Sequence, residues 1–304
     1  MTSVVEHQAF CAESRQLYLD SRHPDQGALD WKEALSEGRA LVVKALRDSD
    51  YLTDIAGALQ LNGGHMLVYR QLLAPPISQD QFKLICRDWA KSSEKDSRPL
   101  RADASLSVAT TFAEWRSRRL SPWLDAQRKP TRAELTSLIL VAAHLIALQR
   151  VATARRNRIA LEQEASVIAL LERKNWTRLP SKIIDRRAEV PAYHFMHKTR
   201  FASGPNENQE VDIACGLGGT IVLAIECKVT NDDTNSIKRI NDVLKKASAW
   251  KSHWGAFVKP AAVLQGVMKF SDVKRLLDAD VEVFWAHKLD LFGSWLDAMP
   301  REQR

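Results

Sequence analysis

The chain has 304 residues, of which 45% are hydrophobic and 27% are charged. This balance is typical of a globular protein with one large domain or two moderate ones, and it excludes a disordered chain, a collagen-like repeat and a disulfide-rich mini-protein. The 44 Lys and Arg residues outnumber the 37 Asp and Glu residues, which gives a net charge of +7; this charge suits a nucleic-acid partner without requiring one.

The cysteines and the apolar stretches indicate the compartment. Cys11, Cys86, Cys215 and Cys227 match neither a Cys-x-x-Cys metal pair nor a secreted disulfide framework, so we expect reduced thiols in a cytoplasmic protein. The first residues lack a charged leader followed by an apolar stretch, which predicts no signal peptide. The nearly apolar stretch 138–148 is too short to span a bilayer, so we expect no membrane partner.

The first 125 residues predict a helical domain. Apolar residues recur at helical spacing from Leu35 to Leu46 and again from Leu52 to Leu73, where Pro75 and Pro76 end the pattern. We expect this domain, residues 1–125, to enclose DNA, to dimerise or to support the rest of the protein.

Within it, residues 52–73 resemble a helix-turn-helix motif. The pattern consists of Asp54, Ile55, Ala56, Leu59, Leu61, Val68 and Leu72. However, Gln60 replaces the usual Gly, and Gly63 and Gly64 open the presumed second helix. Two interpretations therefore stay open: a DNA-recognition helix, or part of a supporting helical bundle.

A long helical interval follows. Thr131 and Glu134 form a capping box, and no Gly or Pro occurs between Pro130 and Pro180. The interval predicts either one very long helix or two helices with a break in the basic run 150–158.

The second half, residues 126–304, predicts a mixed α/β domain with a central mixed sheet flanked by helices. A helix is expected at 235–251, and another precedes the last strand. The expected strands are 194–201, 210–215, 220–229, 256–267 and 281–285.

Two of these strands carry a group of charged residues. In the stretch 220–229 the odd positions are all apolar, whereas Glu226 and Lys228 share the opposite face. Asp212 lies on the polar face of the preceding strand, and the glycines between the two strands favour a hairpin. The hairpin would bring Asp212 beside Glu226 and Lys228.

Two carboxylates and a lysine on one face suit metal-dependent phosphodiester hydrolysis. Asp212 and Glu226 supply the hard oxygen ligands that Mg²⁺ prefers, and the metal would acidify water and neutralise charge on the phosphate. Lys228 would orient or help to deprotonate that water and would screen the phosphate. The alternative interpretation is a sheet edge with ordinary solvated charges.

A third acid lies on the long helical interval. Glu164 falls on the apolar stripe of residues 158–174, between Ile168 and Leu171 on the helical wheel. A carboxylate in that position is costly unless it is paired or binds a metal. Glu164 is therefore a candidate metal ligand or half of a buried salt bridge.

These residues resemble the motif of the PD-(D/E)xK nuclease superfamily. The similarity rests on Asp212 in QEVDIACG and on Glu226 and Lys228 in AIECKV. It implies a restriction-endonuclease-like fold for roughly residues 155–290, with Mg²⁺ held by Asp212 and Glu226 and also by the carbonyl of Cys227, and with Lys228 at the attacking water. Glu164 would match the helix acid that is frequent in the family, and Val211 stands where the family often has Pro.

A narrower similarity is to type II restriction endonucleases of the XamI group. It rests on ECKVTNDDTNSIKRIND, on KKASAW and on APPISQDQF at 74–82, and it would extend over most of the chain. It implies Mg²⁺-dependent cleavage of double-stranded DNA at a specific site, a homodimer on a palindromic sequence, and a cognate DNA methyltransferase in the same system.

DNA contacts are expected at the start of the helix that follows the Glu226 strand. Asn235, Ser236, Lys238 and Arg239 lie close to the candidate site and carry groups that bind phosphates or bases. A solvated helix face is the other interpretation.

The main expectation is thus a restriction endonuclease. Two alternatives stay open: a repair or recombination nuclease that recognises DNA structure, and a non-catalytic DNA-binding regulator that uses residues 52–73.

Overall fold

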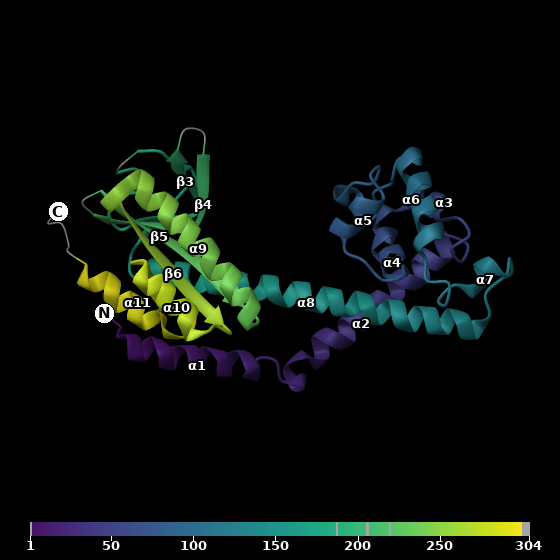
Figure 1. Cartoon of the computed structure of the whole chain (residues 1–304), viewed down its shortest axis with the longest axis horizontal. Helices are drawn as coiled ribbons and strands as arrows, with labels where there is room; N and C mark the ends of the chain where they lie inside the picture. The colour runs from purple at the N-terminus through teal and green to yellow at the C-terminus, as the bar shows by residue number, and fades with distance from the viewer. Residues whose placement is uncertain (1, 187, 205–206, 219, 300–304) are drawn as a thin grey trace. The chain divides into compact units, whose positions relative to one another are not determined.

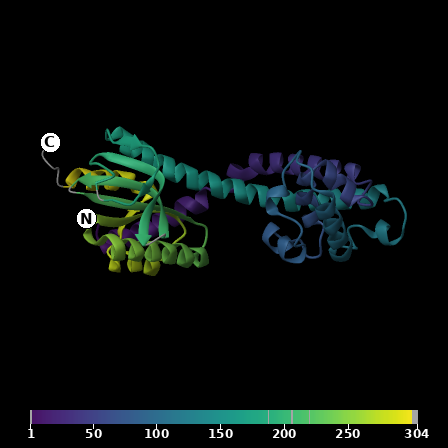
Figure 2. The ribbon, with the colours of Figure 1, turned by 90° about the horizontal axis from the view of Figure 1, so that it is seen from above.

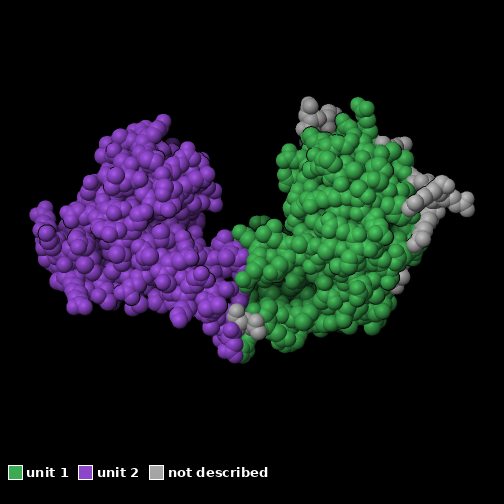
Figure 3. All heavy atoms as spheres, turned by 180° about the vertical axis from the view of Figure 1, so that it is seen from behind, with its two compact units in different colours: residues 1–23, 156–304 green, residues 24–155 purple. Residues whose placement is uncertain are grey.

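A computed structural model describes residues 2–186, 188–204, 207–218 and 220–299 (Figure 1). The chain forms two compact units, coloured separately in Figure 3: unit 1 comprises Met1–His23 and Arg156–Arg304, and unit 2 comprises Pro24–Arg155. The sequence placed the only boundary after residue 125. The structure instead assigns the first helix to the sheet-containing unit and ends unit 2 within a continuous helix.

Unit 2 is helical, as predicted. Its core is built around Val42, Leu59, Tyr69 and Trp123, which are almost fully buried. Its elements are α2 (Pro24–Asp48), α3 (Ile55–Leu61), η1 (Gly63–His65), α4 (Met66–Gln71), α5 (Gln79–Ile85), η2 (Lys91–Ser93), α6 (Ala102–Trp115), α7 (Pro122–Asp125) and the first part of α8 (Arg132–Arg173).

The helix-turn-helix interpretation of residues 52–73 does not agree with this structure. The second helix of the pattern, α4, has six residues, and Met66, Val68, Tyr69 and Arg70 are all buried in the core of unit 2. A recognition helix must expose a face to the major groove. The segment therefore supports the helical core, as the other interpretation held.

Helix α8 is a single helix of 42 residues, which confirms the first of the two alternatives, one very long helix without a break in the basic run. The predicted capping box is present: the Glu134 N–H donates to Thr131 Oγ1 at 3.3 Å, and the Thr131 N–H donates to Glu134 Oε2 at 2.7 Å. By length and composition alone α8 could cross a membrane, which is weak evidence, because core helices meet the same criteria. Leu138 and Leu171 are fully buried, each within a hydrophobic core.

Unit 1 contains a mixed seven-stranded sheet in the order β1-β3-β4-β5-β6-β7, with β2 paired to β3. Strands β3, β4 and β5 are antiparallel, and β5, β6 and β7 are parallel. The strands are β1 (Thr177–Leu179), β2 (Ile183–Ile184), β3 (His194–Gly204), β4 (Glu207–Gly218), β5 (Ile221–Thr230), β6 (Val258–Gly266) and β7 (Glu282–Trp285). The mixed α/β class is confirmed; the two shortest strands, β1 and β2, were not predicted because they carry no alternating pattern.

Helices cover both faces of the sheet. The end of α8 and α11 (Leu289–Ala298) pack on one face, and α9 (Asp233–Trp254) and α10 (Phe270–Asp278) pack on the other. Figure 2 shows α8 above the sheet and α9 below it. Helix α1 (Val4–Asp20) contacts α10 and β6. Short helices η3 (Gly255–Phe257) and η4 (Ala286–Lys288) complete the unit.

Candidate active site

The predicted site lies where β4 and β5 stop pairing. The register between these strands ends at Ile213 and Ile225, and Asp212 and Glu226 are the next residues on each strand. Beyond this point the Cys227 N–H is free of the β4 ladder and donates to Asp212 Oδ2 at 2.8 Å. The hairpin therefore brings Asp212 next to β5, the strand of Glu226, as the sequence predicted.

Glu226 lies at the centre of one group of charges, which we call the Glu226 cluster: Glu226, Lys228, Asp242 and Lys246. The first two and Lys246 are largely buried, whereas the Asp242 side chain is 44% exposed. Glu226 is fully buried, and its Oε2 accepts hydrogen bonds from Lys228 Nζ at 2.6 Å and Lys246 Nζ at 2.8 Å. Lys228 Nζ is also 3.0 Å from Asp242 Oδ2. Because Lys246 and Asp242 belong to α9, Glu226 and Lys228 face this helix.

Burial controls the ionisation of the Glu226 cluster. It raises the pKa of the Glu226 carboxyl, and the negative charge of Asp212 adds to the rise although Lys228 opposes it. Burial also disfavours the Lys228 cation, but Glu226 and the neighbouring acids outweigh it, so the pKa of Lys228 is raised. The cluster thus keeps a lysine cation beside a carboxylate that is poorly solvated.

A second group, the Lys198 cluster, comprises Glu164, His197, Lys198 and Asp212. Lys198 Nζ donates to Glu164 Oε1 at 2.6 Å and to Asp212 Oδ1 at 2.8 Å, and His197 Nε2 lies 2.9 Å from Glu164 Oε2. Burial disfavours the charged form of Asp212, but the hydrogen bonds from Lys198 and from the Cys227 N–H outweigh it and lower the pKa of Asp212. Glu164 therefore forms the salt bridge that was one of its two interpretations; its role as a metal ligand stays a prediction.

The structure assigns Cys227 two contacts. Its side chain packs against the core on the α8 side of the sheet, and its N–H binds Asp212. Burial raises the pKa of the thiol, which makes a thiolate role unfavourable. Its carbonyl as a metal ligand stays a prediction.

Four residues of these clusters were missed by the sequence reasoning: His197, Lys198, Asp242 and Lys246. Lys198 carried a usable signal, because antiparallel pairing of β3 with β4, with His197 opposite Ile213 and Thr199 opposite Val211, sets it opposite Asp212. Lys246 and Asp242 lie on the helix that was predicted after β5, but nothing local indicates which of its charged residues turn inward.

The predicted DNA contacts on α9 divide into two kinds. Lys238 and Arg239 are exposed. Asn235 is tied to the helix start, where both its N–H and its side-chain amide donate to the Asp232 carboxylate. Ser236 is fully buried, and its hydroxyl donates to Asp272 at 3.1 Å. Because Asp272 of α10 lies on this side of the helix, Ser236 is not available to DNA, whereas the neighbouring Ile237 is exposed.

The residues fit a divalent cation in part. Glu226 Oε1 is buried and has no hydrogen-bond partner among the described residues, and a buried polar atom without a partner is costly unless it binds something. Asp212 and Glu226 are hard oxygen donors of the type that Mg²⁺ prefers. Within the described residues, however, no three His, Cys, Asp or Glu side chains are grouped as metal ligands. One oxygen of Glu164 and one of Asp212 instead accept hydrogen bonds from Lys198.

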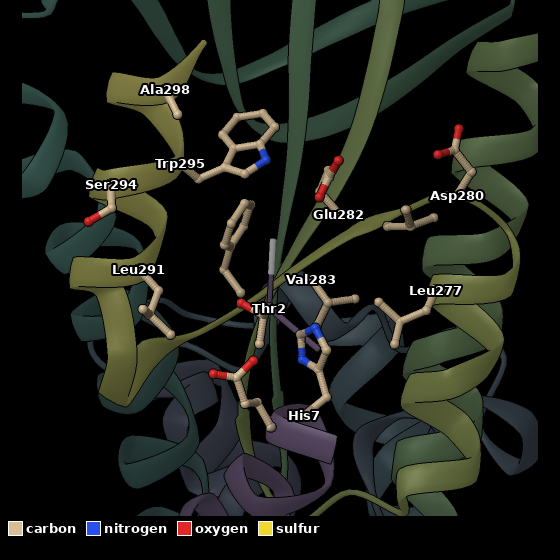
Figure 4. A pocket seen from close by; sticks show the side chains of 13 residues that line it. Thr2, His7, Leu277, Asp280, Glu282, Val283, Leu291, Ser294, Trp295 and Ala298 are labelled. Atoms are coloured by element: carbon tan, nitrogen blue, oxygen red, sulfur yellow. The ribbon is translucent and has the colours of Figure 1, made fainter. Parts of the chain in front are cut away.

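A separate pocket of about 430 Å³ lies along β7, the edge strand of the sheet, between α10, α11 and the start of α1 (Figure 4). Its lining includes His7, Glu282 and Trp295. It contains none of the predicted site residues, so the chemistry points to the two clusters and not to this pocket.

Comparisons with known proteins identify the family of the chain. The profile of the XamI restriction endonuclease family matches residues 50–285. The type II restriction enzyme XamI of Xanthomonas campestris pv. amaranthicola is 31% identical over 221 residues, which cover 71% of this chain and 77% of that enzyme.

Among solved structures, protein VC1899 from Vibrio cholerae aligns with 90% of this chain at 12% identity and a TM-score of 0.32. The alignment spans 58% of that protein, and a similarity at this level carries no argument about function. The family match includes both clusters and most of unit 2. The chain therefore belongs to the XamI restriction endonuclease family and is a type II restriction enzyme, a DNA endonuclease.

Proposed function

We propose that this enzyme cleaves double-stranded DNA at a specific site by Mg²⁺-dependent phosphodiester hydrolysis at Asp212, Glu226 and Lys228. The observation that carries the proposal is Oε1 of Glu226, which is buried and has no hydrogen-bond partner among the residues that the structure describes. It lies on β5 next to the end of the β4–β5 ladder, where Asp212 accepts a hydrogen bond from the Cys227 N–H. A buried carboxylate oxygen without a donor is suited to a cation, and a second carboxylate lies on the adjacent strand.

The chain's own residues have distinct roles in this proposal. Asp212 and Glu226 would hold the ion, with Glu164 and the Cys227 carbonyl as further candidates. Bound Mg²⁺ would supply positive charge to the scissile phosphate and lower the pKa of the attacking water. Lys228, buried and held by Glu226 and Asp242, would orient that water and stabilise charge on the phosphate.

DNA binding beyond the site is proposed for the exposed part of α9. Lys238 and Arg239 project from the first turns of the helix that follows the Glu226 strand, so they can reach the phosphates of a duplex at the site. Asn235 would contribute only if it left its Asp232 partner. If both cations bind phosphates, their replacement by Ala should weaken binding to all sequences equally and reduce its salt dependence.

We also propose a homodimer on a palindromic site, because a two-fold symmetric enzyme matches a two-fold symmetric sequence, and a methyltransferase that protects the same site. Sedimentation velocity with and without duplex DNA tests the first. Resistance of the host genome to the purified enzyme, lost after methylation is removed, tests the second.

The central test is cleavage of plasmid DNA by purified enzyme with Mg²⁺ or with EDTA. Discrete fragments in Mg²⁺ and none in EDTA are expected. Asp212→Asn, Glu226→Gln and Lys228→Met should each abolish cleavage. Glu210→Gln is the matched control, since Glu210 lies on β4 two residues before Asp212, is exposed and pairs with Arg200; it should cut like the wild type.

The outcomes separate the candidate functions. Nicking that depends on flaps or junctions would favour a repair nuclease over a restriction enzyme. Normal cutting by the three site variants, with circular dichroism spectra like the wild type, would show that the site lies elsewhere.

A further inference from the structure

One lysine that the proposed mechanism does not use lies between two of its acids. Lys198 Nζ is 2.6 Å from Glu164 Oε1 and 2.8 Å from Asp212 Oδ1. A cation held jointly by these carboxylates would need the same oxygens. The ammonium therefore lies where it competes with a divalent ion for its ligands.

The backbone of β3 is distorted in a way that sets up this contact. Successive residues of a regular strand point to opposite faces of the sheet, yet His197 and Lys198 both contact Glu164. Lys198 has a φ of +54°, in the left-handed region that residues other than Gly rarely adopt. The normal alternation is thereby interrupted at the residue opposite Asp212, and two consecutive side chains reach the acid on α8.

The exposure of Lys198 allows its contacts with Glu164 and Asp212 to break and re-form. The Lys198 side chain is 53% exposed, whereas the side chains of Glu164 and Asp212 are 10% and 17% exposed. The carboxylates are thus fixed and poorly solvated, and the lysine can swing into solvent without leaving a buried cation behind. Lys228 and Lys246, in contrast, are only 10% and 16% exposed and cannot leave in this way.

We propose that Lys198 is an internal counter-ion that holds Glu164 and Asp212 together in the metal-free enzyme and must be displaced before Mg²⁺ binds. The proposal rests on the metal site of the proposed function and adds a residue that controls its affinity. Lys198 is a positioning residue: it keeps two neighbouring carboxylates in place without metal and lowers the affinity for any divalent ion.

The experiment is a calorimetric titration of Mg²⁺, and of Mn²⁺ as a second probe, into DNA-free protein. Lys198→Met keeps the length of the side chain and removes its charge, so the dissociation constant for the ion should fall by roughly 5–150-fold, the usual range for coupled binding. Arg200→Met is the matched control, because it removes a cation from the same strand whose side chain, within the described residues, pairs with exposed Glu210; its metal affinity should equal that of the wild type.

A second measurement keeps the test valid if Lys198→Met is less stable. Without metal its melting temperature should lie below that of the wild type, since two carboxylates lose their counter-ion, and saturating Mg²⁺ should raise it by more than it raises the wild type. Equal metal affinity and equal stabilisation in the wild type and Lys198→Met would overturn the proposal.

The same titration separates this proposal from the proposed metal site. If Asp212→Asn eliminates metal binding while Lys198→Met leaves it unchanged, the counter-ion role is wrong and the site stands. If neither the wild type nor Lys198→Met binds either ion, both are wrong.

Discussion

Substitution of Gly266 tests how β6 supports β5, the strand that carries Glu226 and Lys228. Gly266 ends β6 opposite Thr230, the last residue of β5, with a φ of +98°. A Cβ at this position would lie 2.0 Å from the Thr230 carbonyl oxygen. The three atoms that this Cβ would meet all belong to the backbone of Thr230, so Gly266→Ala forces β5 and β6 apart.

The loss of stability in Gly266→Ala can be estimated from the backbone strain and from the hydrogen bonds that the displacement of β6 would break. A side chain in this backbone conformation costs about 1–3 kcal/mol. Ser14 Oγ donates to the Gly266 carbonyl at 3.0 Å and accepts from its N–H at 2.9 Å, and loss of both hydrogen bonds costs about 0.5–1.5 kcal/mol each. The total is about 2–6 kcal/mol.

Gly255→Ala is the matched control. Gly255 also has a positive φ, +58°, but an added Cβ would meet nothing within 4 Å. It should therefore cost only the backbone part, about 1–3 kcal/mol. The two variants should differ by about 1–3 kcal/mol, which is roughly a 5–150-fold difference in an equilibrium constant.

Hydrogen–deuterium exchange of the peptides that cover β5 and β6 measures this difference locally, which is needed because the chain has two compact units. Gly266→Ala should lose protection there by that factor relative to Gly255→Ala. It should also lower DNA cleavage, since β5 carries Glu226 and Lys228. Equal protection in the two variants would refute the reasoning.

Three further predictions concern charges and thiols elsewhere. Burial raises the pKa of the Cys11 thiol from 9.0 to about 12, so at pH 8 the native protein should react with a thiol reagent about a thousandfold more slowly there than at an exposed cysteine; a fast phase at Cys11, located by mass spectrometry, would contradict this. Hydrogen bonds from Arg128 and from the Thr131 N–H lower the pKa of Glu134 from 4.5 to about 2. Its stabilisation of α8 is therefore complete above pH 4.5 and is lost as the pH falls towards 2, so the difference in melting temperature between the wild type and Glu134→Gln should shrink over that window; a constant difference would contradict it. Arg70→Met should destabilise unit 2 by about 3–5 kcal/mol in guanidinium unfolding, because buried Arg70 and Glu94 form a two-point ion pair, and adding Glu94→Gln should recover part of the loss.

The sequence was informative where one strand pattern determines the local structure. The alternation in β5 separates apolar residues from Glu226 and Lys228, and the glycines at the end of β4 indicate a hairpin that brings Asp212 to them. Glu164 could be singled out because a carboxylate on an apolar helix stripe needs a partner. Its partner could not be identified, since Lys198 reaches it only through a backbone conformation that no propensity predicts.

Other features depend on tertiary contacts and were out of reach. Ser236 lies in the polar first turn of a helix, where an exposed side chain is expected. In the structure it is buried, and its hydroxyl donates to the carboxylate of Asp272 on α10. The division of the chain at Arg155 has no local signal, because α8 continues through it without Gly or Pro. The burial of Ser236 and the position of the boundary within α8 both depend on which element packs against the segment. Local sequence patterns do not indicate these tertiary contacts.

The two clusters also explain why the net charge of +7 was a weak guide. In the Glu226 cluster and the Lys198 cluster, acids and lysines neutralise each other, so the groups of the proposed site contribute little to the overall charge. Buried ion pairs add little stability compared with apolar residues of the same size, and one oxygen of Glu226 has no hydrogen-bond partner in the described part of the chain. An arrangement that costs stability in this way is expected where charge must be ready for a ligand. The ligand that could engage all of these groups at once carries both a divalent cation and an anionic phosphate, which is the combination that a DNA endonuclease handles.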